Sequence, residues 1–204
     1  MIVWQPIVDL ASGVVLGHEA LARFGSAPPL VVFDAAAERG LSELLDAQCI
    51  AIALQNPPRT GLLFLNVTAA TVRTGHFPRI SPHLARRVVW ELPETPGWSP
   101  RDLPGAMVVA LDDVGAGHAE LVRLSTIAWR YVKADRVLVD QVAHHPGKQA
   151  VMRHLLELAR RRGGFVIAEG VESPDDAAWL KDAGVPYGQG FLWGSPHVLE
   201  VAES

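Results

Sequence analysis

Short apolar runs alternate with longer segments of mixed character along most of the chain. Apolar runs of this kind predict buried strands, and the mixed segments predict helices that pack on them. Strands are predicted at residues 2–10, 14–24, 61–68, 106–115, 129–135, 164–170 and 187–194. Helices are predicted at residues 33–40, 41–56, 118–125, 148–162 and 173–184, and residues 83–94 read as a short helix followed by a strand. Residues 11–13 fit the turn of a hairpin between the first two strands. The alternation after them predicts βαβ units around a parallel sheet in a single domain, residues 1–204.

Polar residues stand where these apolar runs end. Glu91 follows Val-Val-Trp, for example, and Glu169 follows Phe-Val-Ile-Ala. A single charge at a strand end is usually part of a solvated loop, but six runs that each end this way are hard to ascribe to chance. In a parallel barrel the carboxyl ends of the strands meet at one face, where (β/α)8 enzymes place their chemistry. We therefore expect one convergent set: Glu19, Asn66, Glu91, Asp112, Asp113, Lys133 and Glu169.

This set carries more negative charge than its one lysine can balance. Carboxylates that converge on one spot cannot all stay ionised without positive charge among them. Oxygen-rich groups of Asp, Glu and Asn are the ligands that Mg²⁺ and Mn²⁺ prefer. Two cations bridged by an aspartate form the usual clamp for phosphoryl displacement, and adjacent Asp112 and Asp113 suit that arrangement. The residue types alone predict a metal-dependent phosphohydrolase.

Composition narrows the classes of partner. A net charge of −4 argues against a DNA- or RNA-binding protein that works through bulk positive potential. The sequence has no apolar run long enough to cross a membrane. Cys49 is the only cysteine, which excludes an internal disulfide and fits a reducing cytoplasm.

The segment Gly-His-Glu-Ala-Leu-Ala-Arg-Phe contains the Glu19-Ala20-Leu21 signature of the EAL-domain phosphodiesterases. The tripeptide alone is a weak signal, because all three residues are common. Seven segments nevertheless resemble the family's motifs in the family's order: QPIVDLASGVVLGHEALAR, LFLNVT, VVWELPET, LDDVGAGHAEL, YVKADR, VIAEGVES and YGQGFLWGSP. The resemblance implies an EAL-type (β/α)8 TIM-like barrel whose first strand is antiparallel to the others. It also implies hydrolysis of cyclic di-GMP to linear pGpG with two Mg²⁺ or Mn²⁺ ions.

The resemblance assigns roles to single positions. Metal ligands are implied at Glu19, Asn66, Glu91, Asp112, Asp113 and Glu169. Lys133 matches the lysine that orients or deprotonates the attacking water, Gln189 matches a supporting glutamine, and Glu172 matches a further catalytic acid. Glu94 matches the acid that steadies the double-aspartate loop. Contacts to the dinucleotide are implied at Gln5, Leu21 and Arg23.

The sequence departs from the family pattern at several places. Val114, Ala116, Pro93 and Ala134 replace the family's usual residues, and the first two lie on the loop through which the family couples dimerisation to metal binding. Since the first strand is predicted to begin at residue 2, we expect the family's leading helix to be missing from this sequence. Prolines and glycines in residues 95–106 forbid the helix that the family has there. Trimmed outer helices should expose apolar strand surface unless a partner or Trp98 covers it.

Two other functions stay open. One is an EAL-like receptor or protein-interaction module that binds cyclic di-GMP without cutting it. The other is a two-metal phosphoesterase for a different nucleotide. All expected ligand positions are filled, which favours the enzyme, and a homodimer or a regulatory protein partner is possible. His18 is expected to point away from the site, since neighbours on a strand face opposite ways.

Overall fold

The computed structural model describes residues 1–75, 77–93, 98, 101, 103, 105, 107–115 and 120–198, without the side chains of 120 and 121. The strands are β1 (Ile2–Asp9), β2 (Val15–Ala22), β3 (Leu62–Asn66), β4 (Val88–Leu92), β5 (Val109–Val114), β6 (Tyr131–Ala134), β7 (Phe165–Ala168) and β8 (Tyr187–Gln189). The helices are α1 (Pro29–Glu38), α2 (Ser42–Gln55), α3 (Ala69–Thr74), α4 (Pro82–Ala85), α5 (Glu120–Thr126), α6 (Arg136–Val139), α7 (Pro146–Arg162) and α8 (Pro174–Asp182), with a 3₁₀ turn, η2 (Val142–His144).

The eight strands of the described chain form a closed barrel in sequence order. Strand β1 runs antiparallel to both of its neighbours, β2 and β8, and every other adjacent pair is parallel. The predicted (β/α)8 barrel with an antiparallel first strand is confirmed. Closure leaves no unpaired edge and brings the carboxyl ends of β2 to β8 to one face.

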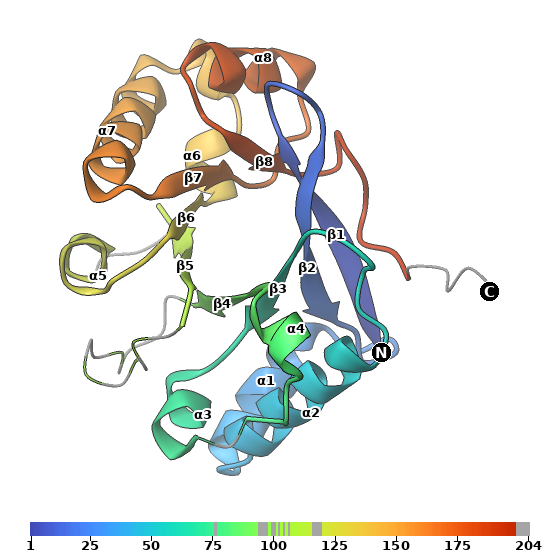
Figure 1. Cartoon of the computed structure of the whole chain (residues 1–204). Helices are drawn as coiled ribbons and strands as arrows, with labels where there is room; N and C mark the ends of the chain where they lie inside the picture. The colour runs from blue at the N-terminus through green and yellow to red at the C-terminus, as the bar shows by residue number, and fades with distance from the viewer. Residues whose placement is uncertain are drawn as a thin grey trace.

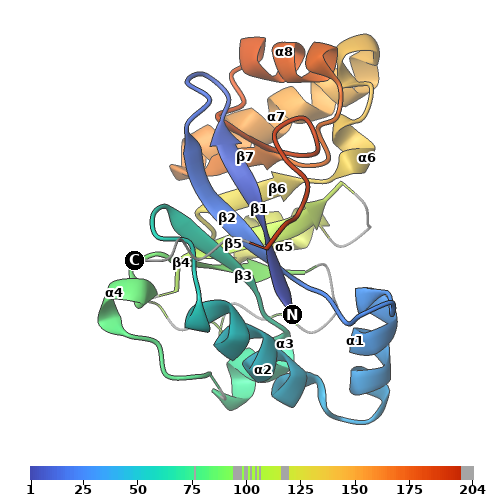
Figure 2. The ribbon, with the colours of Figure 1, turned by 90° about the vertical axis from the view of Figure 1, so that its right-hand side faces the viewer.

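Helices surround the ring of strands (Figures 1 and 2). The α1–α2 pair lies on the side of β2 and β3, whereas α7 and α8 lie on the side of β7 and β8. Gly40, with φ of +68°, separates α1 from α2 at the predicted break, because glycine adopts this conformation without strain. Among the described residues, no helix combines the length and the apolar character that a membrane span requires.

The element boundaries differ from the sequence prediction in several places. Helix α1 begins at Pro29 rather than Phe33, since proline is well tolerated in the first helical turn. Strand β8 ends at Gln189, so the predicted strand through residue 194 is too long. Helices α3 and α6 were not predicted, because short helices of six and four residues offer too few positions for a period to be read.

Apolar residues of the segment between β4 and β5 pack against the main core. Trp98, Leu103 and Met107 are partly buried against the main core, and the Trp98 indole donates a hydrogen bond to the Pro93 carbonyl at 3.2 Å. Trp98 therefore packs on the core, which is consistent with the expectation that it covers apolar surface. Most of residues 95–106 lie outside the described residues, so their predicted loop remains a prediction.

We expect Trp98→Ala to lower the free energy of unfolding by about 2 kcal/mol, below the cost for a fully buried aromatic ring because Trp98 is partly exposed. Urea unfolding would measure the change. Phe191→Ala is the matched control, because a side chain on a residue that is 63% exposed should change stability by less than about 0.5 kcal/mol. Equal effects of the two substitutions would contradict a covering role for Trp98.

Candidate active site

The barrel interior consists of an apolar layer followed by a polar layer. The apolar layer packs Ile7, Phe64, Val89, Ala110, Tyr131 and Ile167 together. Side chains two positions apart on a strand point the same way, so each residue two further along lies one level above. Those residues are Asn66, Glu91, Asp112, Lys133 and Glu169, and on the antiparallel β1 the equivalent step runs backwards to Gln5. The apolar layer is thus the floor of the polar site.

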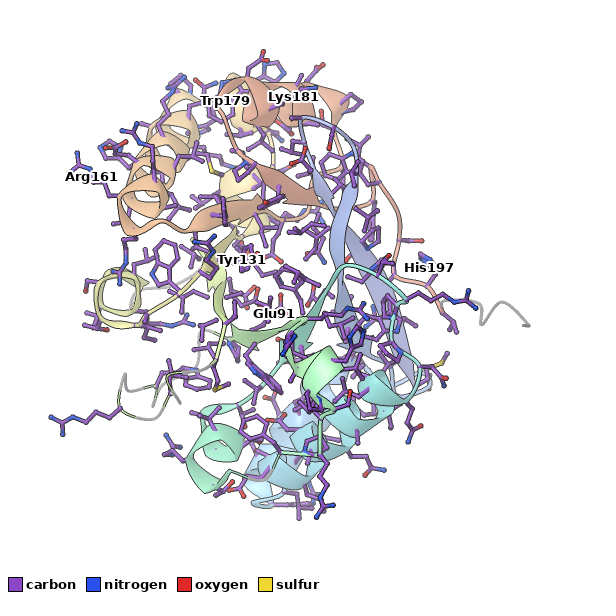
Figure 3. All side chains as sticks on the ribbon, viewed as in Figure 1. Glu91, Tyr131, Arg161, Trp179, Lys181 and His197 are labelled. Carbon is purple, nitrogen blue, oxygen red and sulfur yellow. The ribbon has the colours of Figure 1, made fainter. Side chains whose placement is uncertain are left out.

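Lys133 occupies the centre of the polar layer. Its ammonium Nζ lies 2.7 Å from a carboxylate oxygen of Glu91 and 2.8 Å from oxygens of both Asp112 and Glu169. A fourth carboxylate, Glu19, lies 3.4 Å away. The lysine is 1% exposed and Glu91 is fully buried, so water contributes little to either charge. Figure 3 shows Glu91 in the middle of the ring of strands, whereas Arg161, Lys181 and His197 lie at the periphery.

A network of amides holds Glu19 in place. The Gln189 amide donates to Glu19 at 2.6 Å and to the Gln5 oxygen at 3.1 Å, and Gln5 donates in turn to the Gly194 carbonyl. The Asn66 amide donates to Glu19 at 3.3 Å and to Glu91 at 3.1 Å. These contacts join β1, β2, β3, β4 and β8 around one group of carboxylates.

The adjacent aspartates reach the same site through a break in strand register. Between Leu111 and Val114, β5 has one more residue than the paired stretch of β6, and Asp113 has a φ of +57°. Neighbours on a regular strand face opposite sides, but a bulge re-aims one of them. A non-glycine residue in the left-handed region is strained, and such strain concentrates at functional sites. The irregularity is what lets both carboxylates face the barrel mouth.

The pKa of Lys133 lies well above its ordinary value. Burial alone would lower it, but Asp112, Glu169 and the other two carboxylates outweigh burial. For Glu19, burial opposes ionisation, yet Lys133 and the amides of Gln189 and Asn66 bring its pKa below the ordinary value. These shifts favour the protonated form of Lys133 and the ionised form of Glu19.

The remaining carboxylates show that one ammonium is too little. Burial, followed by repulsion from Glu19, raises the pKa of Glu91 well above its ordinary value despite Lys133. Burial also raises the pKa of Glu169 well above its ordinary value, and the attraction of Lys133 does not offset it. Burial and the neighbouring Asp112 raise the pKa of Asp113 to about 6. The site thus has unbalanced negative charge, which is the deficit that divalent cations fill.

The donor set fits hard divalent cations. One oxygen from each of Asp112, Asp113 and Glu169 falls within 4.8 Å of the others, a spacing that a single ion can span. Glu19, Asn66 and Glu91 form a second oxygen-bearing group on β2, β3 and β4. Asn66 turns its NH₂ toward the two carboxylates, so its amide would have to rotate for its oxygen to serve as a ligand.

A pocket of about 520 Å³ extends from this site toward α1 and α2. Glu19, Asn66 and Asp112 line its inner end, and Leu21 and Arg23, two of the expected dinucleotide contacts, line its wall. Gln5 is 8% exposed and is engaged with Gln189 and Gly194 inside the polar layer.

Other expected site residues lie elsewhere. Glu172 forms an ion pair with Arg136 at 3.2 Å, and both side chains are exposed. It does not take part in the ion pairs around Lys133 that the structure describes. Glu94 lies outside the described residues, as does Ala116. His18 lies near His197 and Arg87, and burial together with these two groups holds its pKa below the ordinary value. These neighbours fit a side chain that points away from the site.

The sequence reading missed Asp46. This residue is 5% exposed on α2 and lines the same pocket as Asn66. The available signal was a lone carboxylate in the apolar helix segment Leu-Leu-Asp-Ala-Gln-Cys-Ile-Ala.

Comparison with known proteins agrees with this geometry. The EAL domain family model matches residues 106–196. The cyclic di-GMP phosphodiesterase RocR of Pseudomonas aeruginosa is 29% identical over 95% of this chain and 56% of its own length. The probable cyclic di-GMP phosphodiesterases PdeN and PdeB of Escherichia coli are 35% and 27% identical over 45% and 93% of this chain. The chain spans only 18% and 41% of those two relatives.

Solved structures of EAL-domain proteins share this fold. The manganese and cyclic di-GMP complex of Klebsiella pneumoniae BlrP1 has a TM-score of 0.79 at 27% identity, over 96% of this chain and 55% of that one. The EAL enzyme Bd1971, bound to cAMP and cyclic di-GMP, has a TM-score of 0.81 at 22% identity, over 97% and 62%. Barrel topology, motif order and these similarities lead to one conclusion: residues 106–196 match the EAL domain, and the chain as a whole is similar to EAL-domain proteins.

Proposed function

We propose that this chain hydrolyses cyclic di-GMP to linear pGpG with the help of two divalent cations, Mg²⁺ or Mn²⁺. The observation that carries the proposal is the buried group of carboxylates around Lys133, whose negative charge exceeds what one ammonium can balance. The substrate is proposed from the relatives, which are named for cyclic di-GMP. We expect the reaction to take place in the cytoplasm.

The proposed ligand sets follow the two groups of oxygens. Glu19, Asn66, Glu91 and Asp112 would hold one ion, and Asp112, Asp113 and Glu169 would hold the other, with Asp112 shared. When bound, such ions supply Lewis-acid charge at the phosphate and lower the pKa of water.

The chain's own groups would orient the reactants. Lys133 is the central donor of the polar layer, and we propose that it positions the attacking water or takes part in its proton transfer. Gln189 supports this role by fixing Glu19. Arg23 on the pocket wall would bind a phosphate of the dinucleotide, because a guanidinium can contact two oxygens at once. Glu172 and Glu94 keep only the supporting roles that the family resemblance implies.

The reaction is tested by incubating the protein with cyclic di-GMP and Mn²⁺ and separating the products by chromatography. We expect pGpG to accumulate with the wild-type protein. The Lys133→Ala variant should have a turnover lower by about 100-fold or more, while its affinity for cyclic di-GMP changes little, because a group that acts in the transition state affects rate more than binding. If the wild-type protein binds cyclic di-GMP but returns it uncut, the chain is a receptor rather than an enzyme.

A second prediction concerns the shared ligand. Asp112→Asn should weaken Mn²⁺ binding more than about tenfold in calorimetry. Removing a group that only hydrogen-bonds to a metal ligand already lowers metal affinity by about that factor, and Asp112 is proposed to be a ligand itself. Asp175→Asn is the control, because the side chain of Asp175 is 78% exposed and lies on α8. Undiminished Mn²⁺ binding by Asp112→Asn would show that Asp112 does not bridge the two ions.

A further inference from the structure

Asp46 is a buried carboxylate that hydrogen-bonds the segment leaving β3. A single oxygen, Oδ2, accepts the Thr68 backbone N–H at 2.8 Å and the Thr71 hydroxyl at 2.7 Å. Asp46 is 5% exposed and Thr71 is fully buried, so these hydrogen bonds face little competition from water. Helix α2 is thereby attached to the β3–α3 connection by two short contacts.

That connection begins at Asn66. Thr68 is the N-cap of α3, and its hydroxyl also accepts the Thr71 N–H at 3.4 Å. Between Asn66 and Thr68, the Val67 N–H donates to the Glu91 carbonyl at 3.1 Å. The two residues after Asn66 are therefore held by consecutive backbone N–H groups, one bound to β4 and the other to Asp46.

Asn66 depends on this support more than Glu91 does. It is the last residue of β3 and is solvent-exposed, whereas Glu91 is fully buried within β4. Its amide nevertheless has to contact Glu19 and Glu91 on two different strands. Asn66 is paired with Glu91 in the β3–β4 ladder, but no strand residue follows it, so the conformation of Val67 and Thr68 also determines where its side chain points.

We propose that Asp46 is a positioning residue that acts through Thr68 to hold Asn66 at the candidate metal site. The proposal rests on the proposed metal-dependent function, since Asn66 matters there as a ligand. Groups behind metal ligands typically change metal affinity 10- to 100-fold. Asp46 would thus set metal affinity without itself being a metal ligand.

Asp176 offers a matched control for a purely structural role. It is also 5% exposed, and its carboxylate also accepts two hydrogen bonds, from the backbone N–H groups of Gln141 and Ala143. These contacts join α8 to the η2 segment, not to a strand end that carries a candidate ligand. Asp46→Ala and Asp176→Ala should therefore cost similar stability and differ in their effect on metal binding.

The experiment measures Mn²⁺ affinity by calorimetry and the free energy of unfolding by urea titration, for Asp46→Ala, Asp46→Asn and Asp176→Ala. We expect Asp46→Ala to weaken Mn²⁺ binding about tenfold. Asp46→Asn should stay within about threefold of wild type, because one amide oxygen can accept both hydrogen bonds in place of Oδ2. Asp176→Ala should leave the affinity unchanged.

Equal Mn²⁺ affinity for wild type and Asp46→Ala would overturn the inference, as would an equal loss in Asp176→Ala. If Asp46→Ala does not fold, Thr68→Pro is the alternative, because proline has no backbone N–H to donate to Asp46. The Thr68 φ of −84° is close to that of proline. Thr68→Pro should show the same weakening, and unchanged affinity would again overturn the inference. A wild-type protein that binds Mn²⁺ but leaves cyclic di-GMP uncut would contradict the proposed function alone, since the calorimetry would still decide the role of Asp46.

Discussion

The structure depends on the burial of one ammonium, Lys133, among four carboxylates: three are on strands β2, β4 and β5, and the fourth, Glu169, directly follows β7. Removing such charges from water is costly, and the attraction between them offsets the cost only when the geometry is close and other hydrogen bonds complete it. The barrel supplies that geometry, because inward-pointing side chains from β2, β4, β5 and the end of β7 meet the side chain of Lys133 on β6 inside the closed ring. The apolar layer beneath, which includes Ile7 and Ile167, excludes water from below. The polar layer above it forms the inner end of an open pocket.

The same arrangement explains why the site is suited to cations. Balance by Lys133 is incomplete: burial, and then repulsion from neighbouring carboxylates, raises the pKa values of Glu91, Glu169 and Asp113. The register irregularity at Asp113 adds backbone strain to this electrostatic strain. A fold selected only for stability would replace such a group by apolar residues, so its retention points to function.

Much of this arrangement can be predicted from the sequence. The features that could not be predicted depend on contacts between elements that lie far apart in the sequence. The alternation of strands and helices predicted a parallel sheet, and the family resemblance added the closed barrel. The polar residues at the ends of apolar runs predicted the convergence of Glu19, Glu91 and Asp112, since a strand's direction fixes where its last side chain lies. The prediction that Lys133 alone cannot balance the site agrees with the pKa directions. The sequence did not reveal how two adjacent aspartates face one site, because a bulge depends on pairing between strands. Asp46 and the exposed pairing of Glu172 with Arg136 depend on tertiary contacts that no local pattern encodes.

The most direct test of this account is the stability of Lys133→Met with and without Mn²⁺, measured by urea unfolding. In a metal chelator the variant should lose about 3 kcal/mol or more, because the buried carboxylates lose their common partner. Mn²⁺ should raise the free energy of unfolding of the variant by more than it raises that of the wild type. In the variant the cations would balance carboxylate charge that Lys133 balances in the wild type. A variant as stable as the wild type in chelator, or one that gains nothing from Mn²⁺, would contradict the claim that unbalanced carboxylate charge organises this site.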